Sequence, residues 1–297
     1  MGKGVLEILA SALLFSLIPI VARAVYATGM DPLSLVVWRM GFAAVIAALV
    51  CKVRHRGLAL PRPLWRPAAL ASIAYAGMSI TFFLACGHIE AGVANAVLHL
   101  APVIVVAVSA VMGQIRVTPI VALAVVLAVL GLVLVSGYQG GSLSSIGLSL
   151  ALVAAVFSAL YSLTVAARGL CKADPFTLVF YTCAATGILA FALGLTQPEW
   201  RLAVNAAGIG GAFVLAALCT VVALGCFVRG TQKLGPSLAS MLGNVEVAFT
   251  VIAGWALLGE KVTVLALLGY GAIVVACAIM GALQAGAGDD EKSGDAF

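Results

Sequence analysis

The sequence predicts an all-α integral membrane protein, with ten transmembrane helices arranged as two inverted five-helix repeats. Three observations predict this fold class: an apolar composition, ten apolar runs of span length, and two halves that resemble each other. Of the 297 residues, 64% are hydrophobic and only 9% are charged, whereas about a quarter of the residues of a soluble domain are charged. The 16 basic and 11 acidic side chains cannot cover a soluble core of this size. The mean hydropathy of +1.20 therefore indicates a chain surrounded mainly by lipid.

Apolar runs bounded by charged residues, Gly or Pro define the ten spans, because about 20 apolar residues cross the hydrocarbon core. The first run has full span length and contains Glu7 and Pro19, so we expect it to remain as a helix and not to be cleaved as a signal peptide. One membrane domain, residues 1–284, accounts for the chain, and residues 285–297 are predicted to form a polar, disordered tail. The predicted spans are 5–26, 32–51, 67–87, 91–112, 117–136, 143–167, 175–195, 208–229, 236–258 and 262–284.

Short motifs recur in the two halves at nearly constant spacing, which indicates an internal duplication. The offsets between matched residues run from 142 to 146, so each repeat is five helices long, with repeat one at 4–137 and repeat two at 143–284. An odd number of helices per repeat inverts the second copy in the membrane, as expected of a carrier that works by alternating access. The matched pairs are Asp31-Pro32 with Asp174-Pro175, Phe15-Ser16 with Phe157-Ser158, Met112-Gly113 with Leu258-Gly259, and Val117-Thr118 with Val262-Thr263.

The basic residues predict the orientation of the chain in the membrane. An even number of spans puts both termini on one side, and twelve basic residues fall on that side, against three on the other. Cytoplasmic loops carry such an excess of Lys and Arg, so we expect both termini to be cytoplasmic. The net charge of +5 is thereby explained without a nucleic-acid partner. The twelve are Lys3, Lys52, Arg54, Arg56, Arg62, Arg66, Arg116, Arg168, Lys172, Arg229, Lys233 and Lys292, and the three are Arg23, Arg201 and Lys261.

The chain resembles the EamA group of the drug/metabolite transporter superfamily. The residues that carry the resemblance are the five-helix duplication with Asp-Pro opening the second helix of each half, Arg39 within VVWRMGF, and the segment EVAFTVIAGWALLGE before the tenth helix. The resemblance implies an inner-membrane carrier of the bacterial type, commonly an exporter of amino acids or related metabolites. It also implies a central cavity lined by the first, third, fourth, sixth, eighth and ninth helices. Where such proteins often have Glu-Pro, this chain has Glu246-Val247, while the first half keeps Ala101-Pro102.

Polar side chains on the fourth and ninth helices are the first candidates for binding a substrate. Asn95, His99 and Pro102 share one face of the fourth helix. An imidazole at this depth must face protein or a watery cavity, and Pro102 can kink the helix beside it to form a gate. The alternative is an interhelical hydrogen bond with a static kink. If the repeats align as expected, Asn244 on the ninth helix faces His99 across the pseudo-twofold axis.

Two charged residues lie well inside predicted spans. Glu246 is the one acid near the centre of a span, and it lies about 200° around the helix from Asn244. We therefore expect it to face a packed neighbour and not the cavity, with proton coupling as the alternative role. Arg39 is its natural buried partner.

Aromatic and hydroxyl side chains recur together on three helices that the resemblance sends to the cavity. Such groups suit a ligand with an apolar body and a few polar groups, although the same stripes also occur in simple packing. The candidate substrate-binding residues of this kind are Phe15, Tyr75, Ser79, Phe82 and Tyr161, and Pro19 is a second candidate gating residue.

The predicted function is that of a secondary transporter for small neutral or zwitterionic metabolites, most of all an amino-acid exporter. Phosphorylated substrates need several buried Arg or Lys side chains, and only Arg39 is available. An exporter of drug-like or cationic compounds is the alternative. An intramembrane enzyme is disfavoured because GxSxG and HExxH motifs are missing, and a channel would need no inverted repeat.

The seven cysteines show no CxxC pair, so we expect free thiols, no metal and no cofactor. The expected partners are the bilayer and a small molecule, and a monomer is compatible with the sequence.

Overall fold

The computed structural model describes residues 2–101, 103–105, 108, 118–136, 144–167, 170, 173–203, 205–234 and 242–294. Five helical segments in this part are long and apolar enough to cross a membrane by length and composition. They are α1 (Gly2–Tyr26), α2 (Pro32–Val53), α3 (Trp65–Cys86) with the short 3-10 turn η1 (Arg62–Leu64) before it, α8 (Pro175–Leu195), and α9 (Ala206–Ala216) continued by the π-helical η3 (Ala217–Val222) and α10 (Ala223–Leu234).

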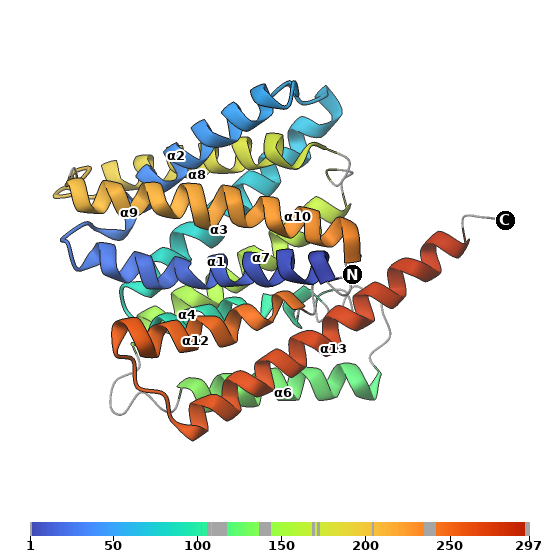
Figure 1. The fold of residues 1–297 in the computed structure, drawn as a ribbon. Coiled ribbons are helices and arrows are strands. Elements are labelled where there is room, and N and C mark those ends of the chain that lie inside the picture. The colour runs from blue at the N-terminus through green and yellow to red at the C-terminus, as the bar shows by residue number, and fades with distance from the viewer. Residues whose placement is uncertain are drawn as a thin grey trace.

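Five further apolar helices complete a set of ten segments. They are α4 (Ala91–Leu98), α6 (Pro119–Ser136), α7 (Ser145–Ala167), α12 (Val245–Leu258) and α13 (Val264–Gly294). The described residues contain helices and no strand, and the helices lie side by side as one bundle (Figure 1). The predicted all-α fold with ten helical segments is confirmed.

The repeated Asp-Pro motif begins the second helix of each half. Asp31 accepts a hydrogen bond from the backbone N–H of Ser34 at 2.9 Å, and Asp174 accepts one from the N–H of Phe176 at 3.0 Å. A capping carboxylate satisfies an N–H group that has no partner within the helix, and Pro at the first helical position has no N–H to satisfy. The same local chemistry therefore starts α2 and α8.

Contacts between the helices follow a pseudo-twofold pattern. The contact between α1 and α10 corresponds to the contact between α7 and α3 in the other half. In the same way, the α1–α12 contact corresponds to α7–α4, and the α3–α8 contact corresponds to α9–α2. The pairs α2–α8, α6–α13 and α4–α12 join equivalent helices of the two halves, as expected where an axis passes between them. Because each half has five spans, the second repeat is inverted in the membrane relative to the first.

Small residues allow the paired helices to approach closely. A Cβ atom added to Gly131 of α6 would lie 2.7 Å from the carbonyl oxygen of Gly269 in α13, and one added to Gly77 of α3 would lie 2.8 Å from the ring of Phe157 in α7. Lipid gives no hydrophobic force between helices, so membrane bundles rely on such close packing.

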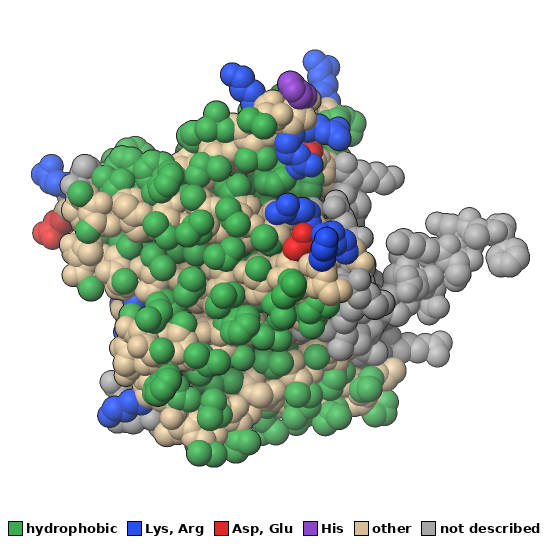
Figure 2. All heavy atoms as spheres, viewed as in Figure 1, with side chains coloured by type: hydrophobic (Ala, Val, Ile, Leu, Met, Phe, Trp, Pro, Cys, Tyr) green, Lys and Arg blue, Asp and Glu red, His purple; other side chains and the backbone are tan. Residues whose placement is uncertain are grey.

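The surface of the bundle is apolar along the helices and charged at their ends. Figure 2 shows hydrophobic side chains over the faces of α1, α9, α10 and α13, with most Lys and Arg side chains near the end that holds the N-terminus. Residues such as Val45, Leu123 and Ile188 expose half or more of their surface on this outer face. Lipid stabilises such a surface, whereas water does not.

The end of the chain differs from the prediction. The sequence predicts loss of regular structure from residue 285, but α13 continues to Gly294 and projects beyond the bundle (Figure 1). No proline interrupts this segment, and a helix that is already formed extends at little cost because each added residue closes one hydrogen bond. The low hydropathy of the tail therefore does not decide its secondary structure.

Candidate functional site

A cavity of about 280 Å³ lies between the two repeats. Each of the helices that the resemblance implied contributes to it, and α2 and α8 contribute as well. The residues of repeat one that line it are Phe15, Ile18, Arg39, Tyr75, Met78, Ser79, Phe82, Phe83, Asn95 and Leu98. The residues of repeat two are Tyr161, Val179, Thr182, Cys219, Thr220, Leu224 and Glu246.

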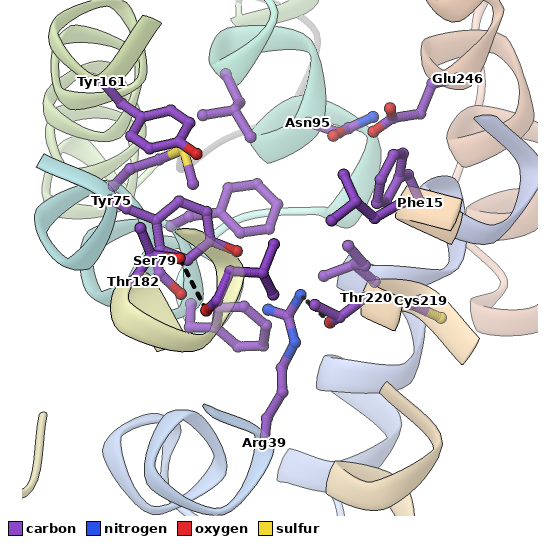
Figure 3. A pocket seen from close by; sticks show the side chains of 17 residues that line it. Phe15, Arg39, Tyr75, Ser79, Asn95, Tyr161, Thr182, Cys219, Thr220 and Glu246 are labelled. Atoms are coloured by element: carbon purple, nitrogen blue, oxygen red, sulfur yellow. Dashed lines mark hydrogen bonds between the residues drawn. The ribbon is translucent and has the colours of Figure 1, made fainter. Parts of the chain in front are cut away.

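Six of the predicted substrate-binding residues lie together on the wall of this cavity. They are Phe15, Tyr75, Ser79, Phe82, Asn95 and Tyr161. The rings of Tyr75 and Tyr161 meet edge to face across α3 and α7, with centroids 5.4 Å apart, and they form the aromatic side of the cavity in Figure 3. Their role in binding stays a prediction, but the structure places them where that role requires.

The fourth and ninth helices meet in an antiparallel register that the sequence left open. His99 Nε2 lies 3.4 Å from Glu246 Oε1, and one turn away Asn95 donates a hydrogen bond of 2.8 Å to the hydroxyl of Thr250. The Thr250 hydroxyl in turn lies 3.0 Å from the carbonyl oxygen of Glu246. A polar network thus joins α4 to α12 at the edge of the cavity.

This register corrects two expectations about α12. Glu246 lines the cavity, although the sequence placed it on the opposite face. Asn244 is buried, precedes the first residue of α12 and is not among the lining residues. The two residues cannot share a direction because they are about 200° apart on the helix. His99 also lies behind the wall and contacts Glu246, so its expected partner Asn244 is replaced by the carboxylate.

Arg39 lies in the cavity wall, but its contacts differ from those expected. Its Nη2 donates a hydrogen bond of 3.2 Å to the Thr220 hydroxyl, and its guanidinium lies 4.9 Å from the centroid of the Phe83 ring. Figure 3 shows Arg39 and Glu246 on different sides of the cavity. The proposed Arg39–Glu246 pair is therefore absent from the described contacts, because the carboxylate lies beside His99, the C-cap residue of α4.

The comparisons with known proteins agree with this architecture. The model of the EamA-like transporter family matches residues 2–137 and 145–282, which is one match for each repeat. The chain belongs to the EamA-like transporter family. A solved crystal structure has the same fold, with a TM-score of 0.65 at 18% identity, and the alignment covers 94% of this chain and 96% of that one. No curated protein matches the sequence.

A π-helical turn in this EamA-like transporter positions Thr220, a residue that no sequence pattern indicated. Within η3 the Thr220 hydroxyl donates a hydrogen bond of 3.0 Å to the carbonyl of Leu215, five residues earlier, and so keeps a lone pair for Arg39. Single π-turns are frequent at functional sites. No local sequence signal marks this one, because Ala217, Leu218 and Val222 are ordinary residues of an apolar helix.

The two proline residues proposed as gates have different outcomes. Pro19 is buried inside α1, which continues through it. Because Pro19 has no N–H, the carbonyl of Phe15, a cavity residue, loses its partner within the helix. Pro102 lies outside the described residues.

Ion pairs between the repeats tie the bundle at both ends. At one end Arg23 of α1 donates to Glu260 Oε1 at 2.9 Å, and the same oxygen accepts the backbone N–H of Ala91, the first residue of α4, at 2.8 Å. At the other end Lys233 of α10 donates to Glu7 of α1 at 2.7 Å. Glu260 is the more buried acid, with 8% of its side chain exposed against 23% for Glu7.

Proposed function

We propose that this EamA-like transporter exports amino acids with apolar or aromatic side chains across the inner membrane by alternating access. The observation that carries the proposal is the cavity between the repeats, where aromatic rings lie beside one cation, Arg39, and one carboxylate, Glu246. An amino acid presents the matching chemistry: two opposite charges and an apolar body.

The composition of the cavity argues against phosphorylated substrates. Phosphate esters carry up to two negative charges and are bound by clusters of Arg and Lys. Arg39 is the one basic residue among those that line the cavity, and Glu246 would repel a phosphate. A zwitterion meets no such penalty.

Alternating access requires that contacts between the repeats break at one end while those at the other end hold. The pairs Arg23–Glu260 and Glu7–Lys233 both join repeat one to repeat two. They lie near opposite ends of α1, so each is suited to close one side of the cavity.

Export of cationic, drug-like compounds is a second candidate. The observation that favours it is that Glu246 lines the cavity with Phe15, Tyr75 and Tyr161, since a carboxylate among aromatic rings is a good environment for an organic cation. Arg39 opposes this function by its charge, which is why amino acids are the first proposal.

We also propose that both termini are cytoplasmic, which makes the end with Glu260 external. In a background without the seven native cysteines, a membrane-impermeant thiol reagent added outside will label Glu199→Cys but not Arg56→Cys. Both positions are exposed, so accessibility of the side chain does not bias the comparison. Labelling of Arg56→Cys alone would reverse the orientation.

The transport function is tested by counterflow in proteoliposomes. Vesicles loaded with unlabelled amino acid will take up labelled leucine, phenylalanine, tryptophan or threonine faster than empty vesicles, because a carrier that reorients with substrate is stimulated from the trans side. Weakly saturable uptake without trans-stimulation would indicate a channel. No uptake of any amino acid, together with uptake of a permanently cationic aromatic compound, would establish the second candidate.

A further inference from the structure

Arg39 is a buried cation without a counterion among the described residues. Only 4% of its surface is exposed, and the ion pairs of the described chain are Arg23–Glu260, His99–Glu246 and Lys233–Glu7. Its Nε atom is buried without a hydrogen-bond partner. An isolated charge in a low-dielectric interior is costly unless an opposite charge accompanies it.

Two acids of the described chain were candidates for the counterion, and neither contacts Arg39. Asp31, the N-cap of α2, accepts the N–H of Ser34 and the indole N–H of Trp200 at 3.0 Å. Glu246 lies beside His99 on a different side of the cavity (Figure 3). A cation therefore lies at the cavity wall, and no carboxylate of the described residues forms an ion pair with it.

The guanidinium is fixed in place even though it is not neutralised. The Thr220 hydroxyl accepts one of its hydrogen bonds, and the ring of Phe83 lies against its face. These contacts leave the remaining N–H groups without a described acceptor, and Figure 3 shows the guanidinium directed toward the cavity from α2. A planar cation held in this way is prepared for an anion of carboxylate shape, which can accept two parallel N–H groups.

We propose that Arg39 binds the carboxylate of the transported substrate, and that Thr220 and Phe83 position the guanidinium for it. The inference rests on the proposed transport of amino acids and deepens it by assigning the orientation of the substrate: the carboxylate lies at α2 and η3, and the ammonium lies toward Glu246 and Asn95. The substrate supplies the missing counterion, so Arg39 sets specificity for acids over amides and amines.

The test compares pairs of ligands that differ at one end only. Inhibition of labelled phenylalanine uptake is measured with phenylalanine, with phenylalaninamide, which lacks the carboxylate, and with 3-phenylpropionate, which lacks the ammonium. In the wild type, phenylalanine will inhibit at about 30-fold lower concentration than the amide, the low end of what loss of one partner of a buried pair costs. The same preference is then measured by thermal shift on purified variants, so that a variant without transport is still informative.

Three variants separate carboxylate binding from a structural role. Arg39→Gln will bind phenylalanine and its amide equally well, whereas its preference for phenylalanine over 3-phenylpropionate will persist, because Glu246 is unchanged. Thr220→Val will reduce the acid preference severalfold by releasing the guanidinium. Arg229→Gln, which removes an exposed cation outside the cavity, will leave both preferences at the wild-type value.

The outcomes distinguish failure of the inference from failure of the proposed function. If wild-type protein binds phenylalanine and Arg39→Gln still prefers the acid over the amide, the assignment of Arg39 is wrong while amino-acid transport stands. If Arg39→Gln does not fold, Arg39→Lys decides: it keeps the charge but not the planar fork, and an unchanged acid preference in it overturns the proposal. If the wild type binds none of the three ligands, the proposed function and the inference both fall.

Discussion

Replacing Glu246 with Gln will lower the kcat/KM of labelled phenylalanine transport by about 100-fold, within the range expected for removing one charge from a buried pair. Glu246 is the one carboxylate among the residues lining the cavity, so the amide variant loses the only acidic group there that can bind an ammonium. It also replaces the carboxylate that lies 3.4 Å from His99 with a neutral amide. The measurement is initial uptake into proteoliposomes at equal amounts of inserted protein.

Glu199→Gln is the matched control for Glu246→Gln. Glu199 is an exposed acid in the connection between α8 and α9, and it lies outside the cavity and outside both ion pairs that join the repeats. We expect its kcat/KM to change by less than about threefold, because an exposed charge contributes little. Wild-type transport by Glu246→Gln would show that the carboxylate serves packing alone. His99→Gln keeps a hydrogen-bond donor for Glu246, so its defect should be smaller than that of Glu246→Gln.

Replacing Glu260 with Gln will make the cavity about tenfold more reactive from outside. Glu260 joins Arg23 of α1 to the first turn of α4, where it accepts the N–H groups of Ala91 and Gly92. Gln keeps the shape but loses the charge, and weakening these charge-assisted bonds by about 1.4 kcal/mol shifts the equilibrium between closed and open states tenfold. Arg23→Gln should have the same effect.

Cys219 provides a native reporter for this change, because it lines the cavity. The other six cysteines are replaced, and the rate at which an external, impermeant thiol reagent modifies Cys219 is measured. Lys233→Gln breaks the pair with Glu7 at the opposite end, so it should not raise the external rate. Equal rates in wild type, Glu260→Gln and Arg23→Gln would show that this ion pair is no gate.

The sequence predicted the fold because each membrane span can be recognised from its own residues. Each span must satisfy its own backbone hydrogen bonds in lipid, so length and apolarity identify it without knowledge of its neighbours. The Asp-Pro caps act within three residues, and Asp31 and Asp174 begin α2 and α8 as expected. The aromatic cavity residues Tyr75 and Tyr161 were found in another way: helical spacing groups each with hydroxyl side chains on one face, and the family resemblance implied that these helices line the cavity.

The sequence by itself determined the ten spans, the duplication and six of the residues that line the cavity, because these depend on apolarity and on the period of the helix. The tertiary structure alone decided which polar groups meet. Each residue along a helix is rotated by about 100°, so an error of one or two residues in aligning the two repeats changes which face of a helix meets its neighbour. For this reason Glu246 and not Asn244 lies at the cavity, and His99 contacts the carboxylate. The partner of Arg39 depends on the π-turn that positions Thr220. The two residues are 181 positions apart in the sequence, so their contact exists only once the helices have packed, and no local sequence pattern predicts it.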